Sequence, residues 1–131
     1  MPNGFEATPV DIRELLDRQR RAWETCADPD AVAADFAEDA VFAAPHENYV
    51  GRAAIRAAAA GFFAYAESVQ IDITRIMTSG SHGVVEWDWA EYPRDGSQPR
   101  HAKDAIIFEV RNGQFTQWRE YINWLPADGT K

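Results

Sequence analysis

The chain has 131 residues, of which 46% are hydrophobic and 26% charged, and this composition fits one globular domain with a sizeable core. Its 13 basic and 21 acidic residues give a net charge of -8, which repels nucleic-acid phosphates. A single cysteine, Cys26, excludes an internal disulfide, and no apolar run is long enough to cross a bilayer, so neither nucleic acid nor a membrane is an expected partner.

The N-terminal segment bears on where the protein is expected to be located. The N-terminal segment lacks the basic and apolar regions of a signal peptide, so we expect a cytoplasmic protein. We expect one domain over residues 1–131, with a core from about residue 8 to about residue 125 between short flexible ends. No cluster of cysteine and histidine has zinc-ligand spacing, which predicts that no metal is bound.

Two helices are expected before the first strand. Apolar residues recur at helical spacing from Ile12 to Trp23, which predicts one buried stripe on a long helix. The sequence Asp28-Pro29-Asp30 is a second helix start signal, and Val32 and Phe36, four residues apart, predict a short helix ending before Glu38.

A short strand and a third helix follow. Residues Ala40 to Ala44 form an apolar segment stopped by Pro45, which predicts a strand. We expect a polar loop over residues 46–49, in which His46 is either solvated or in contact with a substrate. A helix is predicted from residue 52 to about residue 66, and Gly61 in its interior indicates close packing or a bend. Phe62 is either core or a surface for stacking a ligand.

Four strands complete the chain as a meander. Apolar and polar residues alternate from Val69 to Met77, with Arg75 on the apolar side, and again from Val84 to Tyr92. The last two strands are joined by Asn112-Gly113, the strongest short signal for a hairpin.

Three of these strands place a carboxylate on the side expected to be buried. Asp104 shares its side with Ile106 and Phe108, Glu91 follows Trp87 and Trp89, and Glu120 lies in the set Thr116, Trp118, Ile122 and Trp124. A buried carboxylate loses hydration worth several kcal/mol unless it is paired or protonated. The three acids therefore predict a polar centre inside an apolar pocket; the alternative is that each faces a wet rim or an arginine.

The order of elements predicts an α+β fold. We expect a curved, mostly antiparallel sheet wrapped over the N-terminal helices to form a cone with one pocket. The pocket is expected to be lined by Trp87, Trp89, Glu91, Asp104, Ile106, Trp118, Glu120 and Ile122, with Phe62 and His46 from outside the sheet.

Short motifs along the chain resemble a known superfamily. They are Phe36-Ala37-Glu38-Asp39, Pro45, Gly51-Arg52-Ala53-Ala54-Ile55, Phe108-Glu109-Val110-Arg111-Asn112-Gly113 and Trp118-Arg119-Glu120-Tyr121. From about Asp11 to Trp124 the chain resembles the nuclear-transport-factor-2-like cone fold, in its SnoaL-like polyketide cyclase and limonene-epoxide hydrolase branch. This fold hosts hydrolases, isomerases, cyclases, dehydratases and binding modules, so the resemblance implies the fold more strongly than the reaction.

The resemblance to the epoxide hydrolases is incomplete. In those enzymes an acid in the Trp-Arg-acid-Tyr motif activates water, and the resemblance places Glu120 there. Their second acid matches Glu91, but Trp89 stands where they have a bridging arginine. Phe42 and Ala44 stand near the positions of a tyrosine and an asparagine that hold the water, and neither side chain can hydrogen-bond water. The resemblance thus argues against epoxide hydrolysis.

The cyclases and ketosteroid isomerases of the same fold imply a different acid. Their proton-transfer acid falls at Ile106 in this sequence, one inward position after Asp104. Asp104 is therefore a hypothesis for the same role.

We expect a SnoaL-like enzyme, an isomerase, cyclase or dehydratase, that acts without a cofactor on a hydrophobic cyclic or polyketide-like substrate. Asp104 is the favoured acid/base, with Glu120 and Glu91 as the other catalytic candidates. The alternative is a binding module of the same fold. A homodimer through the outer sheet face, which carries Glu86 and Tyr121, is expected in either case.

Overall fold

The computed structural model describes residues 9–127, which form three helices and six strands. The helices are α1 (Pro9–Thr25), α2 (Pro29–Ala33) and α3 (Arg52–Tyr65), and the strands are β1 (Phe36–Ala44), β2 (Glu47–Val50), β3 (Ala66–Ser79), β4 (His82–Pro93), β5 (Arg100–Arg111) and β6 (Gln114–Trp124). The ends that we expected to be flexible, residues 1–8 and 128–131, lie outside the described residues.

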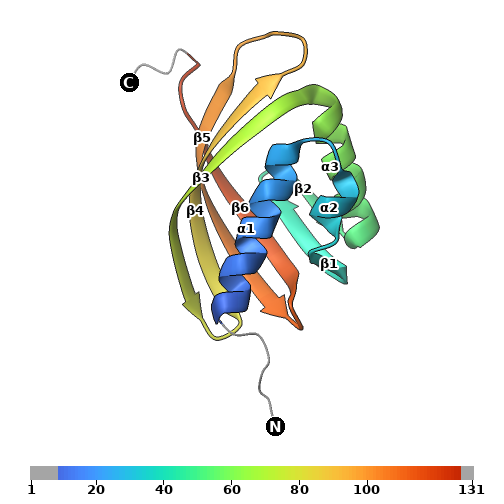
Figure 1. The fold of residues 1–131 in the computed structure, drawn as a ribbon, viewed down its shortest axis with the longest axis vertical. Helices are drawn as coiled ribbons and strands as arrows, with labels where there is room; N and C mark the ends of the chain where they lie inside the picture. The colour runs from blue at the N-terminus through green and yellow to red at the C-terminus, as the bar shows by residue number, and fades with distance from the viewer. Residues whose placement is uncertain (1–8, 128–131) are drawn as a thin grey trace.

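One curved sheet organises the fold. Its strand order is β2-β1-β6-β5-β4-β3, and its neighbours are antiparallel except for β1 and β6, which run parallel. Figure 1 shows α1 lying across one face of the sheet, with α2 and α3 beside β1 and β2. The α+β prediction and the four-strand meander are confirmed. None of the helices within residues 9–127 is both long and apolar enough to cross a bilayer.

The core lies between α1 and the inner face of the sheet. The inward residues Ile106, Phe108 and Val110 of β5 are at most 2% exposed, as the alternation of the sequence predicts. On β6 the rings of Phe115 and Trp118 pack edge to face, with centroids 4.8 Å apart. Large buried aromatic rings of this kind dominate core energetics and hold the sheet against the helix.

A tight turn and a bulge set the register of β5 and β6. Asn112 and Gly113 have φ angles of 53° and 76°, as a two-residue hairpin of the predicted type requires. The register then shifts, because Glu109 pairs with Gln117 whereas the next residue of β5 pairs with Phe115. Phe115 is therefore buried and Thr116 is not, so the prediction that Thr116 shares the inward side is wrong. From Trp118 onward the predicted alternation is confirmed.

The second helix is shorter than predicted. It ends at Ala33, and Phe36 is the first residue of β1, so Val32 and Phe36 do not share a helix. Between them Asp35 is buried and accepts hydrogen bonds from Arg18 Nε at 2.8 Å and Gln19 Nε2 at 3.1 Å. This network fixes the chain where it turns from helix to strand.

Two further local predictions are wrong. Residues 47–50 form β2, not a loop, and they pair with β1 at the edge of the sheet, where polar side chains are tolerated. In β3 the register shifts between Ile73 and Arg75, which leaves Arg75 exposed and turns Ile76 toward the core. In both cases the backbone pairing of the strands, and not the side-chain pattern, sets the local structure.

Alanine substitution at two glycines is expected to change stability in opposite directions. A Cβ at Gly83 of β4 would overlap the ring of Phe108 and lie 2.9 Å from the carbonyl oxygen of Met77. A Cβ at Gly61 of α3 would meet no atom within 4 Å, so the close packing predicted there is absent. In urea unfolding we expect Gly83→Ala to lower the free energy of unfolding by about 1–3 kcal/mol and Gly61→Ala to raise it by about 1 kcal/mol. Equal stability of Gly83→Ala and the wild type would contradict the tight packing.

Candidate functional site

The inner face of the sheet and the helices enclose a cavity of about 310 Å³. Its wall is aromatic, and three carboxylates and one arginine interrupt it. The lining consists of Trp23, Phe42, Tyr49, Ile55, Ala58, Phe62, Tyr65, Trp89, Glu91, Arg100, Asp104, Glu120, Ile122 and Trp124. These residues come from α1, α3 and every strand except β3, so elements far apart in the sequence must come together to form the cavity.

Each of the three carboxylates accepts a hydrogen bond from a tryptophan. Trp87 Nε1 donates to Asp104 Oδ2 at 3.0 Å, from the position directly opposite on the neighbouring strand. Trp89 Nε1 donates to Glu91 Oε1 at 2.7 Å, two residues along the same strand. A hydrogen bond to an ionised acceptor is stronger than one between neutral groups, so these indoles stabilise acids inside an apolar wall.

The third pair repeats this arrangement on β6. Trp118 Nε1 donates to Glu120 Oε2 at 3.0 Å, again two residues along one strand. Trp87 and Trp118 are only 2% and 1% exposed and lie outside the lining of the cavity. They therefore lie behind the carboxylates as donors, where we expected them to line the pocket.

Glu91 has further partners. Tyr65 Oη donates to Glu91 Oε2 at 2.9 Å, and Arg100 Nη1 lies 3.8 Å from the same oxygen. The Arg100 guanidinium also lies over the ring of Trp124, 3.8 Å from its centroid. Although no arginine stands at position 89, the neighbouring strand thus supplies one to Glu91. Because Arg100 is 52% exposed, this group lies where the cavity opens to solvent.

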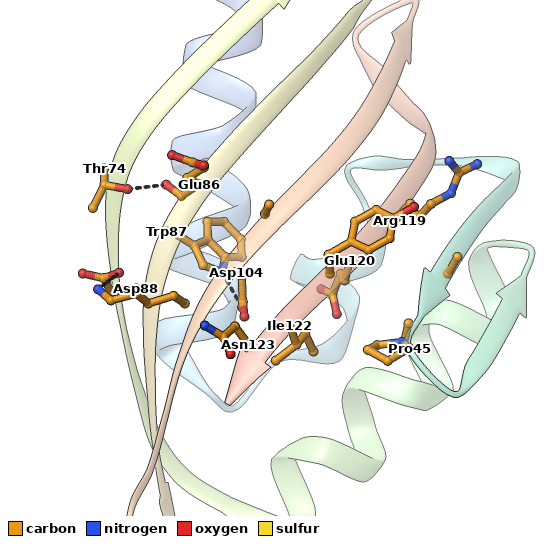
Figure 2. A pocket seen from close by; sticks show the side chains of 15 residues that line it. Pro45, Thr74, Glu86, Trp87, Asp88, Asp104, Arg119, Glu120, Ile122 and Asn123 are labelled. Carbon is orange, nitrogen blue, oxygen red and sulfur yellow. Dashed lines mark hydrogen bonds and ion pairs between the residues drawn. The ribbon is translucent and has the colours of Figure 1, made fainter. Parts of the chain in front are cut away.

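Asp104 and Glu120 have fewer partners. Asp104 is 7% exposed, and its Oδ1 is buried without any hydrogen-bond partner. Glu120 is half-buried, because protein surrounds its carboxyl group while the cavity leaves it partly accessible. Asp104 pairs with Ile122 and Ile106 pairs with Glu120, so the two acids are diagonal neighbours on one face, about 7–8 Å apart at the backbone. Figure 2 shows both side chains, together with the bond from Trp87 to Asp104.

Burial perturbs both carboxyl groups. Burial raises the pKa of Asp104 from 3.8 to about 6, against the Trp87 hydrogen bond and with help from the charges of Glu91 and Asp88. Burial also raises the pKa of Glu120 from 4.5 to about 7, against the Trp118 hydrogen bond and with help from the charge of Asp104. Two interacting acids titrate as a pair, so near neutral pH one protonated and one ionised carboxyl group share the cavity.

The structure brings most of the predicted site residues together. Phe62, Trp89 and Ile122 line the cavity with the three acids. Ile106 is fully buried in the core, and His46 is exposed in the turn before β2, outside the lining. The catalytic and binding roles of these residues stay predictions.

Several residues of the wall were not predicted from the sequence. Trp23 comes from α1, where Gln19 Oε1 accepts its indole N–H at 2.8 Å. Tyr49 was missed because β2 was expected to be a loop. Arg100 begins β5 and lies opposite Glu91 in the register of β4 and β5, which only the strand pairing reveals.

The opposite face of the sheet carries an open groove of about 940 Å³, whose lining also includes Trp87, Asp104, Glu120 and Ile122. Thr74, Glu86, Asp88, Arg119 and Asn123 are among the residues that line it, and Figure 2 labels them. Tyr121, also in this groove, is 53% exposed. The homodimer expected through this face stays a prediction. Among the described residues no group of three or more His, Cys, Asp or Glu side chains is arranged to hold a metal ion.

Comparison with known sequences identifies one family model. A model described as a SnoaL-like domain matches residues 16–118. Among curated proteins none matches the chain.

Solved structures share the fold. A hypothetical protein with a ketosteroid isomerase-like fold from Catenulispora acidiphila, solved in complex with trimethylamine, has a TM-score of 0.78 at 24% identity, covering 95% of this chain and 100% of its own. An LEH-like epoxide hydrolase from M. tuberculosis has a TM-score of 0.76 at 20% identity, covering 87% of this chain and 84% of its own. A protein named as a SnoaL-like polyketide cyclase, from Jannaschia sp. CCS1, has a TM-score of 0.73 at 16% identity, covering 91% of both chains. The predicted nuclear-transport-factor-2-like cone is thereby confirmed; the reaction is not, because the fold hosts many.

The raised pKa values predict how stability depends on pH. A carboxyl group whose pKa is higher in the folded state than in the unfolded state favours folding while protonated, and this contribution is lost as the pH rises through the folded value. For Asp104 the shift from 3.8 to about 6 corresponds to on the order of 3 kcal/mol. We expect the free energy of unfolding in urea to fall between about pH 4 and about pH 7, the range between the ordinary and the raised pKa values, and to fall less in Asp104→Asn.

The matched control for this measurement is Glu86→Gln. Glu86 lies on the outer face of β4, and its side chain is 46% exposed. This variant should follow the wild type across the pH range. A wild-type stability that does not change between about pH 4 and about pH 7 would contradict the raised pKa values.

Proposed function

Because the chain belongs to the SnoaL-like domain family, we propose that its cavity catalyses proton transfer on a small hydrophobic molecule, with carboxyl groups of the chain as acid and base. The expected reactions are those of an isomerase, cyclase or dehydratase, and the expected substrate is cyclic or polyketide-like. The observation that carries the proposal is the free oxygen of Asp104, which is buried at a cavity that Glu120 also faces.

The two acids are suited to complementary roles. With pKa values of about 6 and about 7, the pair holds one proton near neutral pH, which is the condition for an acid and a base to work together. The ionised carboxylate removes a proton from a carbon next to a carbonyl group, while the protonated partner donates its proton to the carbonyl oxygen. Return of a proton to another carbon completes an isomerisation, and attack of the enol carbon on a second carbonyl group completes a cyclisation.

The surroundings of the pair support this chemistry. The Trp87 and Trp118 indoles each hold one oxygen of a carboxyl group and leave the other oxygen free. A fixed carboxyl group loses little freedom on reaching the transition state, which is a large share of what a catalytic site contributes. The rings of Phe62 and Trp89 are 5.6 Å apart and offer an apolar surface to a flat substrate.

The base can be tested with a generic substrate. In 5-nitrobenzisoxazole, removal of the carbon-bound proton by a base breaks the N–O bond and forms a nitrile and a coloured phenolate, so absorbance follows the reaction. We expect the protein to exceed an equal concentration of acetate, with a rate that rises between about pH 5 and about pH 8 as the carboxyl groups ionise. Asp104→Asn should lower the rate about a hundredfold.

Two comparisons complete this test. Glu86→Gln, on the outer face, should retain the wild-type rate. An unchanged rate in Asp104→Asn would remove Asp104 from the role of base, and a wild-type rate no higher than that of acetate would favour a ligand-binding module over an enzyme.

Epoxide hydrolysis is a poorer fit to the cavity. Glu120 stands where the epoxide hydrolases have their base, but Phe42 and Trp89 line the cavity near positions where those enzymes have polar groups. A water held by one carboxylate is free to rotate, so it is poorly placed for attack. We therefore expect no diol from limonene oxide above a control without protein. Turnover at about 1 s⁻¹ would contradict this and move Glu120 and Glu91 ahead of Asp104 as the catalytic pair.

A further inference from the structure

The charge inside the cavity is unbalanced. The lining holds three carboxylates, and Arg100 is the one basic residue among the described residues that form it. Arg100 pairs with Glu91 and lies over Trp124 at the exposed side of the cavity. The negative charge that Asp104 and Glu120 carry when they ionise is therefore left without a cation in the described lining.

An unpartnered atom lies at the same place. Asp104 is only 7% exposed, and its buried Oδ1 accepts no hydrogen bond. Leaving a charged acceptor unpaired in the interior costs more than leaving a neutral one unpaired, so a bound partner that supplies positive charge or a proton would relieve it. Asp104 also lines the cavity, so a partner held there would lie beside this carboxyl group.

The aromatic wall defines what kind of cation fits. Trp23, Phe62 and Trp89 pack against one another with ring centroids 5.7, 6.1 and 5.6 Å apart, and all three line the cavity, so together they form one aromatic part of its wall. The faces of aromatic rings attract organic cations, and tryptophan is the strongest of them. A metal ion instead requires several oxygen ligands, and no such group is present among the described residues.

We propose that the cavity binds small organic ammonium cations, with the charged nitrogen near Asp104 and Glu120 and the apolar groups against the rings of Trp23, Phe62 and Trp89. This inference names a charged group on the substrate of the proposed reaction and rests on that proposal for the identity of the site. A cavity of about 310 Å³ is at the lower end of the range for small-ligand sites, roughly 300–1,000 Å³, which favours a compact amine.

Protonation of the site should control this binding. In the cavity the titratable and charged groups beside the two acids are Glu91, Arg100, Tyr65 and Tyr49. In the groove on the outer face, whose lining also includes both acids, they are Glu86, Asp88, Lys103, Arg119 and Tyr121. Since burial raises the pKa of Tyr49 and Tyr65 above the ordinary value of 10, neither titrates near pH 7, where Asp104 and Glu120 change charge. The affinity for a cation should therefore rise with pH, whereas that for a neutral ligand should not.

The test compares choline with 3,3-dimethylbutan-1-ol, in which carbon replaces the charged nitrogen and the shape is kept. By calorimetry at about pH 8 we expect choline to bind the wild-type protein at least about tenfold more tightly than the neutral analogue. At about pH 5.5 choline should bind at least about fivefold more weakly, with the neutral analogue changed by less than about twofold.

Matched variants locate the binding. Glu120→Gln should weaken choline about tenfold and leave the neutral analogue within about twofold, and Glu86→Gln on the outer face should change neither. If Glu120→Gln does not fold, the ligand pair and the pH series on the wild-type protein still decide. The proposal would be overturned if the two ligands bind with equal affinity, if the affinity for choline does not change with pH, or if choline does not bind at about 10 mM. Because no turnover is measured and the benzisoxazole substrate is neutral, this result is independent of the rate test.

Discussion

Hydrogen bonds from indole N–H groups stabilise the carboxylates on the inner face of this sheet. A carboxylate moved out of water loses several kcal/mol of hydration, and one hydrogen bond to a charged acceptor returns only about 1.5–3 kcal/mol. Asp104 and Glu120 each have one such bond in the described structure, so the lost hydration is only partly replaced. Protonation of the carboxyl group removes the rest of the cost. Glu91 adds a tyrosine and an arginine to its tryptophan.

This difference divides the cavity into two regions. On the exposed side, Glu91, Arg100 and Trp124 form a connected polar group in which charge is balanced. Farther along the sheet, Asp104 and Glu120 face an aromatic wall with less compensation. The strand register produces this division, because it places an arginine opposite Glu91 and aliphatic or aromatic residues opposite the other two acids.

Most of the architecture could be predicted because it depends on local patterns. The alternation in β5 predicted which side is buried, and Asn112-Gly113 predicted the hairpin that joins β5 to β6. The bulge at Thr116 could not be predicted, because it is a shift in the pairing of β5 with β6 that alternation along one strand does not reveal. β2 was missed because its polar sequence pairs with β1 through the backbone.

The candidate site was predicted in its acids but not in its partners. The alternation of side chains along three strands was enough to find Asp104, Glu120 and Glu91, because an acid among apolar residues stands out in sequence. This alternation did not distinguish a tryptophan that lines a cavity from one that lies behind a carboxylate, as Trp87 and Trp118 do. That distinction depends on depth below the surface, which spacing along a strand does not encode.

The parallel pairing of β1 with β6 has a consequence for the order of folding. Phe36 at the start of β1 lies beside Phe115 at the start of β6, so strands from opposite ends of the chain must meet before the sheet is complete. Contacts between distant segments form slowly, and β6 is synthesised after the five other strands described. Until β6 pairs with β1, Phe42 and Tyr49 lack the strand that closes the wall beside them. The cavity therefore cannot close before β6 has been made.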